Sequence, residues 1–346
     1  MILCRFSCSP LLLEDQRQRI REKHLSDLCD SAVKYYKKEP LNSEPKMKSG
    51  IVNVLSFDLE DWFHILDIPG TKGIDHWSKY EPKIENITHN LLNILQKKNT
   101  KATFFVLGWV AEKYPELIKK IYGYGHEIGC HGYGHQLITG LCPSEFSKDL
   151  LKARDIIGSI IGCNPISYRG PGFSITVDNE WALETIAECG FKYDSTIYPG
   201  NHGHGGHQKF SSAPVTVRFE KSDKTLKEFP VSVTRVFGKQ MCFSGGGYLR
   251  LLPYFIIKKE FLRFNTHKNP VMVYLHPRDF DPNTPRLKMP FYRAFKCYIN
   301  LESTKKKFER LLEDFAFTAL ESFCEKYDWD NHPSVKIASR NTKFTK

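Results

Sequence analysis

The sequence predicts an α/β fold built on a mostly parallel sheet or barrel. From residue 51 onward, short apolar runs alternate with amphipathic segments, which is the rhythm of repeated strand–helix units. Clusters of polar and charged residues follow the apolar runs directly. Because such folds place their chemistry at the C-terminal ends of the strands, these clusters are candidate functional residues.

The first predicted strand, 51–57, is rich in Val, Ile, Leu and Phe, as expected of a strand buried on both faces. An amphipathic helix is expected over 84–97, followed by a strand over 102–107. The next helix, 115–124, begins with Pro and is closed by Gly125.

A short strand over 127–129 leads into Cys-His-Gly-Tyr-Gly-His. A helix then opens at Pro143, where Ser144 is a suitable N-cap. Its apolar residues recur through Phe146, Leu150, Ile156, Ile157 and Ile160.

The remaining elements repeat the same alternation. A strand over 166–168 runs into Arg-Gly-Pro-Gly, and a helix over 180–189 is expected to be capped by Asp178 and stopped by glycine. Further strands are predicted over 191–194 and 271–275.

Composition narrows the class of protein. The chain has 346 residues, of which 41% are hydrophobic and 26% charged, as in soluble globular proteins, and its longest apolar run is too short for a membrane span. The net charge of +11 suits a solvated surface, an anionic glycan or an anionic membrane surface. No motif for nucleic-acid recognition accompanies the charge, so no specific nucleic acid is expected as a partner.

Ten cysteines are scattered along the chain without a Cys-x-x-Cys pair, so we expect reduced thiols rather than a metal–thiolate site. The first residues do not read as a secretory signal, and Met47 stands just before the first predicted strand. We therefore expect residues 1–49 to be an extension or to lie upstream of a true start at Met47. These features predict a cytoplasmic protein, with peripheral association at the inner face of the membrane as a possibility.

Two histidines and a group of acids suggest a metal site. His131 and His135 lie four residues apart, so a tight turn could direct both imidazoles to one point. Asp58, Glu60 and Asp61 follow the first strand, and a cation would relieve their mutual repulsion.

Two histidines and one carboxylate suit a catalytic zinc, with a second carboxylate free to act as a general base. In an extended strand Asp58 and Glu60 face the same way, which favours Asp58 as base and Glu60 as ligand. Asp61 remains the alternative ligand, if the chain turns at Glu60.

Five ordered motifs resemble the NodB-homology polysaccharide deacetylases, carbohydrate esterase family 4, and most of all the branch found in exopolysaccharide and exosortase-associated gene clusters. These motifs are Phe-Asp-Leu-Glu-Asp, His-Gly-Tyr-Gly-His, Tyr-Arg-Gly-Pro-Gly-Phe, Tyr-Asp-Ser-Thr-Ile-Tyr-Pro and Tyr-Leu-His-Pro. The resemblance covers about Asn53 to Arg286. It implies a distorted (β/α) barrel with fewer than eight strands. We expect the catalytic domain over 50–300, followed by a C-terminal helix and basic tail over 301–346.

The resemblance also implies an activity: metal-dependent hydrolysis of N-acetyl groups on the amino sugars of a poly- or oligosaccharide. The expected partner is an N-acetylated glycan, and the expected cofactor is a divalent metal, zinc first, with cobalt, nickel or manganese as alternatives. The implied residues are the base Asp58, Arg169 that holds it, the acid His276 with Asp194 as its orienting acid, the oxyanion backbone donor Phe173, and the metal ligands His131, His135 and Glu60 or Asp61.

Substrate contacts are expected from Trp62, Tyr198 and His202. Many members of the family carry adjacent aspartates in the first motif, where this chain has Asp58-Leu59-Glu60-Asp61. Two other functions therefore stay open: a metal-independent, allantoinase-like amide hydrolase, and an inactive glycan-binding module. The presence of Asp58 and His276 favours an active enzyme.

Overall fold

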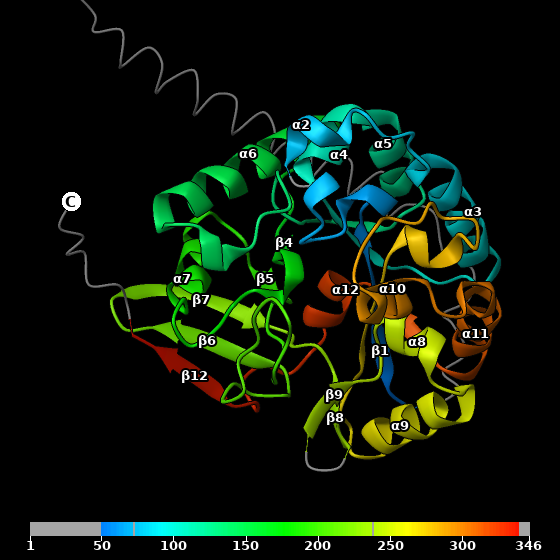
Figure 1. Cartoon of the computed structure of the whole chain (residues 1–346). Helices are drawn as coiled ribbons and strands as arrows, with labels where there is room; N and C mark the ends of the chain where they lie inside the picture. Colours follow the sequence, from blue (N-terminus) through cyan, green and yellow to red (C-terminus); the bar gives the residue numbers. More distant parts are fainter. Residues whose placement is uncertain (1–49, 72, 237–238, 339–346) are drawn as a thin grey trace, which may run out of the picture.

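A curved, mostly parallel sheet forms the centre of the protein in a computed structural model, which describes residues 50–71, 73–236 and 239–338 (Figure 1). The predicted extension over 1–49 and the last residues of the predicted basic tail lie outside this part of the chain. The strand order of the sheet is β10-β1-β2-β3-β4-β5-β7-β6-β12, and β11 also pairs with β1. The strands are β1 (Val52–Leu59), β2 (Thr103–Val106), β3 (Glu127–Cys130), β4 (Ser167–Tyr168), β5 (Tyr193–Asp194), β6 (Val215–Phe219), β7 (Ser222–Glu228), β10 (Met272–Leu275), β11 (Ala316–Thr318) and β12 (Ser334–Ile337).

Every pair in this sheet is parallel except β6–β7, which is antiparallel. Within the described residues no strand ladder joins β10 back to β7, so the barrel is open and distorted. A separate hairpin is made by β8 (Val233–Val236) and β9 (Lys239–Cys242). The predicted α/β class and the predicted barrel are confirmed.

Helices cover the outside of the sheet (Figure 1). They are α2 (Ile74–Trp77), α3 (Ile84–Lys97), α4 (Gly108–Lys113), α5 (Pro115–Gly123), α6 (Pro143–Ile161), α7 (Trp181–Glu188), α8 (Gly246–Leu251), α9 (Tyr254–Thr266), α10 (Phe291–Tyr298), α11 (Leu301–Asp314) and α12 (Leu320–Cys324). The helix predicted over 84–97 is confirmed to the residue. None of the helices in the described ranges is both long and apolar enough to cross a membrane.

Two predicted helix caps are wrong. The helix α6 begins at Pro143 with Cys142 as its N-cap, so Ser144 lies inside the first turn. Asp178 does not cap α7; its neighbour Asn179 instead accepts a hydrogen bond from the Thr176 N–H at 2.6 Å. In both places, the presence of a residue type that favours the N-cap did not show where the helix begins.

The C-terminal part differs from the prediction of one helix and a tail. Beyond α11 the chain adds β11 beside β1, the helix α12 and the edge strand β12. The central strand β1 is therefore flanked by the parallel strands β10, β2 and β11, and its apolar side chains from Val54 to Leu59 are fully buried. This burial holds the C-terminal end of β1, where the first acids lie, in a rigid frame.

Candidate active site

The functional side chains gather where parallel strands end. Asp58 and Glu60 follow from β1, His131 and His135 from the loop after β3, Arg169 from β4, and His276 from β10. Parallel neighbours bring their C-terminal ends to one edge of the sheet, so residues more than 200 positions apart in sequence meet there. Glu60 lies close to both histidines of the β3 loop and to His276.

Glu60, His131 and His135 form a buried cluster. The Glu60 Oε1 atom lies 3.3 Å from His131 Nε2 and 3.0 Å from His135 Nε2. The loop that carries the histidines turns at Gly132 with φ +72°, where a side chain would also strike the Asp149 carboxylate. That carboxylate accepts hydrogen bonds from the Tyr133 and Gly134 N–H groups, and so ties the loop to α6.

The donor atoms of this cluster fit a divalent cation. His131 Nδ1 lies 2.6 Å from the Arg169 carbonyl, which can only accept, so Nδ1 carries the proton in the neutral ring. Its Nε2 then directs a lone pair at the Glu60 carboxylate, which is also an acceptor. Two facing acceptors repel each other, and only a second proton or a cation between them removes this repulsion. Ligand atoms about 2.0–2.1 Å from a tetrahedral zinc lie about 3.3 Å apart, close to the spacing found here.

The electrostatics of the cluster agree with this reading. Burial alone would raise the pKa of Glu60, but His135, His276 and His131 together hold it well below its usual range. Burial opposes a charge on His131, yet Asp58 and Glu60 raise the pKa of that imidazole. The site is thus organised around a carboxylate that stays ionised and has positive charge beside it.

Arg169 holds Asp58 in place. Its Nη1 donates to Asp58 Oδ1 at 2.8 Å and to Ser56 Oγ at 2.8 Å, while its Nε and Nη2 donate to the carbonyl and hydroxyl of Ser195. The guanidinium is fully buried and stacks 4.2 Å from the centre of the Phe105 ring. Because only Oδ1 faces this arginine, the other carboxylate oxygen of Asp58 can face the reacting groups.

His276 closes the opposite side of the site. Its Nε2 lies 3.9 Å from Asp58 Oδ2 and 3.8 Å from Glu60 Oε1. The side chain is 16% exposed, whereas those of Asp58 and Glu60 are each 4% exposed. The imidazole therefore lies at the mouth of the site, where it can meet a group arriving from solvent.

The alternative ligand Asp61 is not part of the cluster. Its Oδ1 accepts from the Trp62 N–H at 2.8 Å, and its Oδ2 accepts from the N–H groups of Lys83 and Ile84 at the start of α3. The chain turns into a short 3-10 helix, η1 (Trp62–His64), immediately after Asp61, and this turn directs the carboxylate away from the histidines. Asp61 is thus a capping residue, and the prediction that it could bind the metal is wrong.

Asp194 does not contact His276, contrary to the prediction. Its Oδ1 accepts from Thr196 Oγ1 at 2.6 Å, and its partner across β5 and β7 is Glu228. Both residues are fully buried. Burial raises the pKa of Asp194, and burial together with the Asp194 charge raises that of Glu228.

The acid that contacts His276 is Asp279, which the sequence analysis missed. Asp279 lies in η5 (Pro277–Phe280), with its Oδ2 3.4 Å from His276 Nδ1. Arg278 of the same turn also escaped prediction, although its Nη1 donates to Glu60 Oε2 at 3.0 Å. Both charged residues stand within three positions of the histidine in the sequence, but their roles depend on contacts with Arg250 of α8 and with Glu60 after β1.

The predicted oxyanion and substrate residues are not displayed as expected. The Phe173 N–H donates to the Gly170 carbonyl at 3.2 Å within a turn, so it is not free to receive an oxyanion in this conformation. Trp62 and Tyr198 are only 7% and 2% exposed, and both pack inside the protein, so neither offers a ring face to a sugar. His202 is half-buried against Tyr198 and Phe173, and burial lowers its pKa to about 4.

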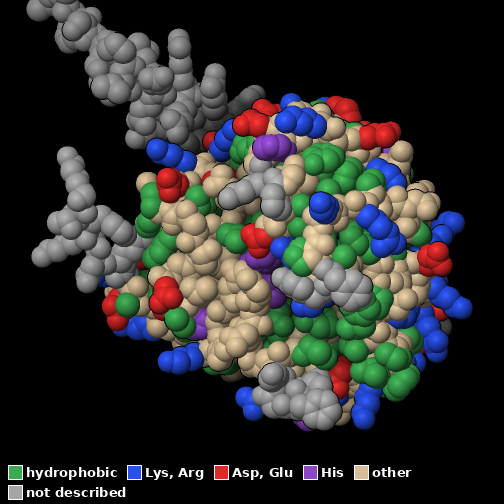
Figure 2. Space-filling model, in the orientation of Figure 1, with side chains coloured by type: hydrophobic (Ala, Val, Ile, Leu, Met, Phe, Trp, Pro, Cys, Tyr) green, Lys and Arg blue, Asp and Glu red, His purple; other side chains and the backbone are tan. Residues whose placement is uncertain are grey.

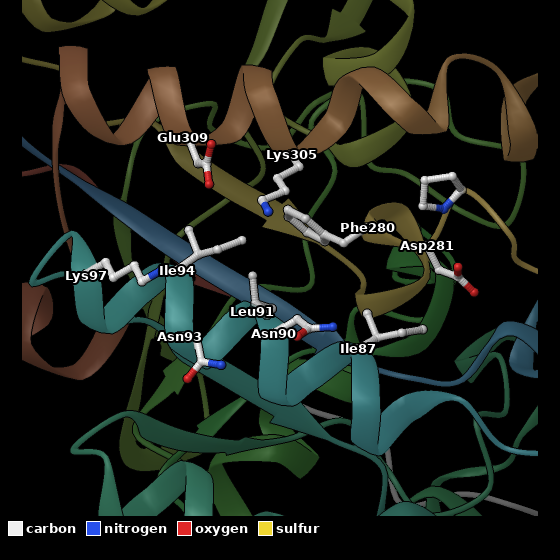
Figure 3. Close-up of a pocket in the computed structure, with 11 residues that line it drawn as sticks. Ile87, Asn90, Leu91, Asn93, Ile94, Lys97, Phe280, Asp281, Lys305 and Glu309 are labelled. Carbon is white, nitrogen blue, oxygen red and sulfur yellow. The ribbon is translucent and has the colours of Figure 1, made fainter.

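A separate groove of about 500 Å³ lies on the outside, between α3 and α11 (Figure 3). Ile87, Leu91 and Ile94 line one wall, and Lys305 and Glu309 of α11 face them across the groove. None of the site residues described above lines it, so it is not the place of the chemistry.

Comparison with known proteins agrees with the geometry. Residues 75–193 match the polysaccharide deacetylase family, and residues 195–325 match a domain of unknown function, DUF3473. A peptidoglycan-N-acetylglucosamine deacetylase of Bacillus cereus is 35% identical over 105 residues, which cover 30% of this chain and 38% of the relative. Chitin deacetylase 1 of Cryptococcus neoformans is 33% identical over 92 residues, covering 27% of this chain and 20% of the relative.

The alignments span well under half the length of these curated relatives. A solved structure of a candidate polysaccharide deacetylase from Mycobacterium smegmatis has the same fold, with a TM-score of 0.53 at 20% identity over 82% of this chain and 91% of that one. The predicted resemblance to the polysaccharide deacetylases is confirmed over residues 75–193, and the fold around them is shared with the Mycobacterium smegmatis structure.

Proposed function

We propose that this protein is a metal-dependent hydrolase that removes N-acetyl groups from the amino sugars of a poly- or oligosaccharide, in the synthesis of an exopolysaccharide or cell-surface glycan. The observation that carries the proposal is the arrangement of three functions at one edge of the sheet. A carboxylate held by an arginine, a Glu–His–His cluster and an imidazole at the mouth lie within 4 Å of their neighbours in the site. Relatives that deacetylate peptidoglycan and chitin support the substrate class.

Glu60, His131 and His135 would hold the metal, most suitably zinc given one carboxylate and two imidazoles. When bound, such a metal supplies Lewis acidity toward the oxygen of the acetamide carbonyl. The fully buried ligands keep bulk water from this side of the site.

The chain's own residues then divide the proton transfers. Asp58, oriented by Arg169, accepts a proton from the water that adds to the acetyl carbon. His276 Nε2, at the mouth of the site, donates a proton to the sugar nitrogen as the C–N bond breaks. The products are acetate and a sugar amine. Before the next substrate reacts, His276 regains a proton and Asp58 loses one, which restores the starting protonation states.

Acetate release from N-acetylglucosamine oligosaccharides tests this function. The wild-type protein should release acetate, and Asp58→Asn should lower the rate by roughly 10²–10⁴-fold, the usual contribution of a general base. Asp223→Asn, an exposed aspartate on β7, is a matched control that should leave the rate unchanged. An Asp58→Asn variant as active as wild type would contradict the assignment, and equal activity on ureides or cyclic amides would favour the allantoinase-like alternative.

We further propose that the enzyme works against an anionic membrane surface, on the cytoplasmic side predicted from the sequence. Phe255 and Leu262, seven residues apart on α9, are 70% and 47% exposed on the ridge that points away from the core. Lys259 and Arg263 are exposed between and beside them. Figure 2 shows hydrophobic side chains together with Lys and Arg over this helix at the lower right. Apolar and basic residues on one outward face are typical of helices that lie in a membrane interface.

Vesicle co-sedimentation tests this location. Vesicles with about a third anionic lipid should bind the wild-type protein, and Phe255→Ser with Leu262→Ser should abolish that binding. A control with Leu151→Ser and Val177→Ser removes two exposed apolar residues outside α9 and should bind like wild type. No binding to the vesicles, or a dimer by light scattering that the α9 variant disrupts, would contradict a membrane partner.

A further inference from the structure

Asp279 touches the catalytic imidazole on the side away from the reaction. Its Oδ2 accepts a hydrogen bond from the His276 N–H at 2.9 Å and lies 3.4 Å from Nδ1 of the same residue. The other ring nitrogen, Nε2, faces Asp58 and Glu60. One carboxylate thus contacts both the backbone and the ring of His276.

Asp279 is in turn held by α8. Its Oδ1 accepts a hydrogen bond from Arg250 Nη1, and both side chains are almost fully buried. Arg250 Nη2 donates to the carbonyls of Lys296 and Cys297, at 2.8 and 3.2 Å, where α10 ends. The carboxylate is therefore fixed by a guanidinium that is itself anchored at two further points.

The close approach of α8 requires a glycine. A Cβ atom on Gly246 would overlap the Asp279 carboxylate, whereas the glycine lets the first turn of α8 lie against η5. Gly246, Arg250 and Asp279 form one packed unit behind His276, which we name the Asp279 clamp. All of its members lie within residues 195–325, the segment that matches a domain of unknown function.

We propose that Asp279, held by Arg250, is the positioning residue of His276, and that building this clamp is a role of the segment 195–325. The inference rests on the proposed deacetylation, in which His276 protonates the leaving nitrogen. A carboxylate at Nδ1 keeps the proton of the neutral ring on that atom, as carboxylates commonly do for functional histidines. Nε2 is then left as the atom that takes up and delivers the second proton, and the contact at Nδ1 favours the ring orientation that faces the site.

A purely structural role makes a different prediction. Asp279 also caps η5 through the His276 N–H, so its loss could simply loosen the turn. A loosened turn would slow every reaction of the site, whereas a mispositioned acid slows only reactions whose leaving group needs a proton. An aryl acetate such as 4-nitrophenyl acetate separates the two cases, because nitrophenolate leaves without protonation.

The test compares two substrates in the zinc-loaded protein. For Asp279→Asn we expect kcat for N-acetyl hydrolysis to fall by roughly 10–100-fold with little change in KM, the usual loss on mutating the partner of a functional histidine. Hydrolysis of 4-nitrophenyl acetate should change by less than about threefold, a margin far below a general-acid contribution. His276→Ala should show the same selectivity with a larger loss.

Asp314→Asn is the control, since Asp314 binds Tyr254 and Lys258 away from the site and should affect neither reaction. Equal losses on the two substrates for Asp279→Asn, or no loss on either, would overturn the proposal.

Nitrogen NMR of the His276 tautomer tests the Asp279 clamp independently of the proposed function. With ¹⁵N-labelled protein, and with His276→Gln to assign the signals, the neutral ring should carry its proton on Nδ1 in the wild type. In Asp279→Asn the signals should move toward a mixture of both tautomers. A wild-type proton on Nε2 would refute the clamp even if acetate is released. Conversely, failure to release acetate from any N-acetyl sugar would refute the function and leave the NMR result standing.

Discussion

Residues 52–169 and residues 246–279 build opposite sides of the same site by different means. In the first region, each functional side chain lies at or just after the end of a buried parallel strand, and the strand itself directs it. In the second, His276 also follows a strand, but Asp279 and Arg250 lie on two short helices, η5 and α8, which their buried ion pair holds together. Arg278 of η5 pairs with Glu60 of the first region. The first region depends on sheet register, and the second depends on contacts between elements that are distant in sequence.

The two regions also differ in charge. The first supplies the carboxylates of Asp58 and Glu60 and the two imidazoles that face Glu60. The second supplies Arg278, which pairs with Glu60, and a carboxylate, Asp279, that Arg250 neutralises. Metal affinity should therefore be set by the first region and tuned by the second, and the variants below test this division.

The largest effect is expected in the metal cluster. His131→Ala removes one of three donor atoms, so we expect acetate release to fall by at least about a thousandfold, several kcal/mol of lost transition-state stabilisation. Metal content, measured by elemental analysis of the purified protein, should fall with it. Activity that survives loss of the metal would instead support the metal-independent alternative.

A smaller effect of the opposite sign is expected from Arg278→Gln. The guanidinium lies 3.0 Å from Glu60 Oε2 and competes with a cation for that carboxylate. Its removal should tighten zinc binding by roughly tenfold, since a nearby like charge costs on the order of 1 kcal/mol or more. Competition with a chromogenic chelator measures the affinity, and Arg286→Gln is a control outside the cluster. Weaker zinc binding in Arg278→Gln would break the proposed division of roles.

Asp61→Asn should affect stability more than chemistry. Asp61 caps η1 and the start of α3 with both carboxylate oxygens, so we expect a loss of about 1–2 kcal/mol in the free energy of unfolding. Zinc affinity and acetate release per folded molecule should stay near wild type. A loss of bound zinc would mean that Asp61, and not Glu60 alone, serves the metal.

The predicted site residues that lie together in the structure are those whose positions are set by the end of one strand. The alternation of the sequence was enough to bring Asp58, His131, Arg169 and His276 to one edge of the sheet. It failed at Asp61, because one tight turn after β1 reverses the direction of a side chain without changing the hydrophobic pattern. The alternation failed to predict the position of Asp194, because the neighbour of this acid, Glu228, is determined by strand pairing and not by nearby sequence.

Asp279 could not be assigned from the sequence for a similar reason. Its role depends on α8 lying against η5, a contact that no periodicity encodes. The sequence motifs were enough to predict the α/β barrel and the resemblance to the polysaccharide deacetylases, whereas the roles of the site residues stay predictions.

The smallest effect concerns the buried pair of Asp194 and Glu228, which lies outside both regions. Both carboxyl groups have a raised pKa in the folded protein, caused first by burial. The stability that comes from the raised pKa values of the two carboxyls is therefore fully present below the unfolded-state pKa values, near 4, and is lost as the pH rises through the folded values.

Glu228→Gln keeps a hydrogen-bond donor without a titrating proton, so its melting temperature should fall less than that of wild type as the pH rises, by a few degrees. Thermal unfolding from pH 5 to 9 measures the difference. Parallel curves for the two proteins would contradict a raised pKa of Glu228 in the folded protein.

The most direct test of the account is acetate release by one preparation of the wild-type protein before chelation, after chelation and after zinc is restored. A metal held by Glu60, His131 and His135 predicts release from N-acetylglucosamine oligosaccharides that chelation abolishes and about one equivalent of zinc restores. Release that is unchanged by removal of the metal would contradict the central claim.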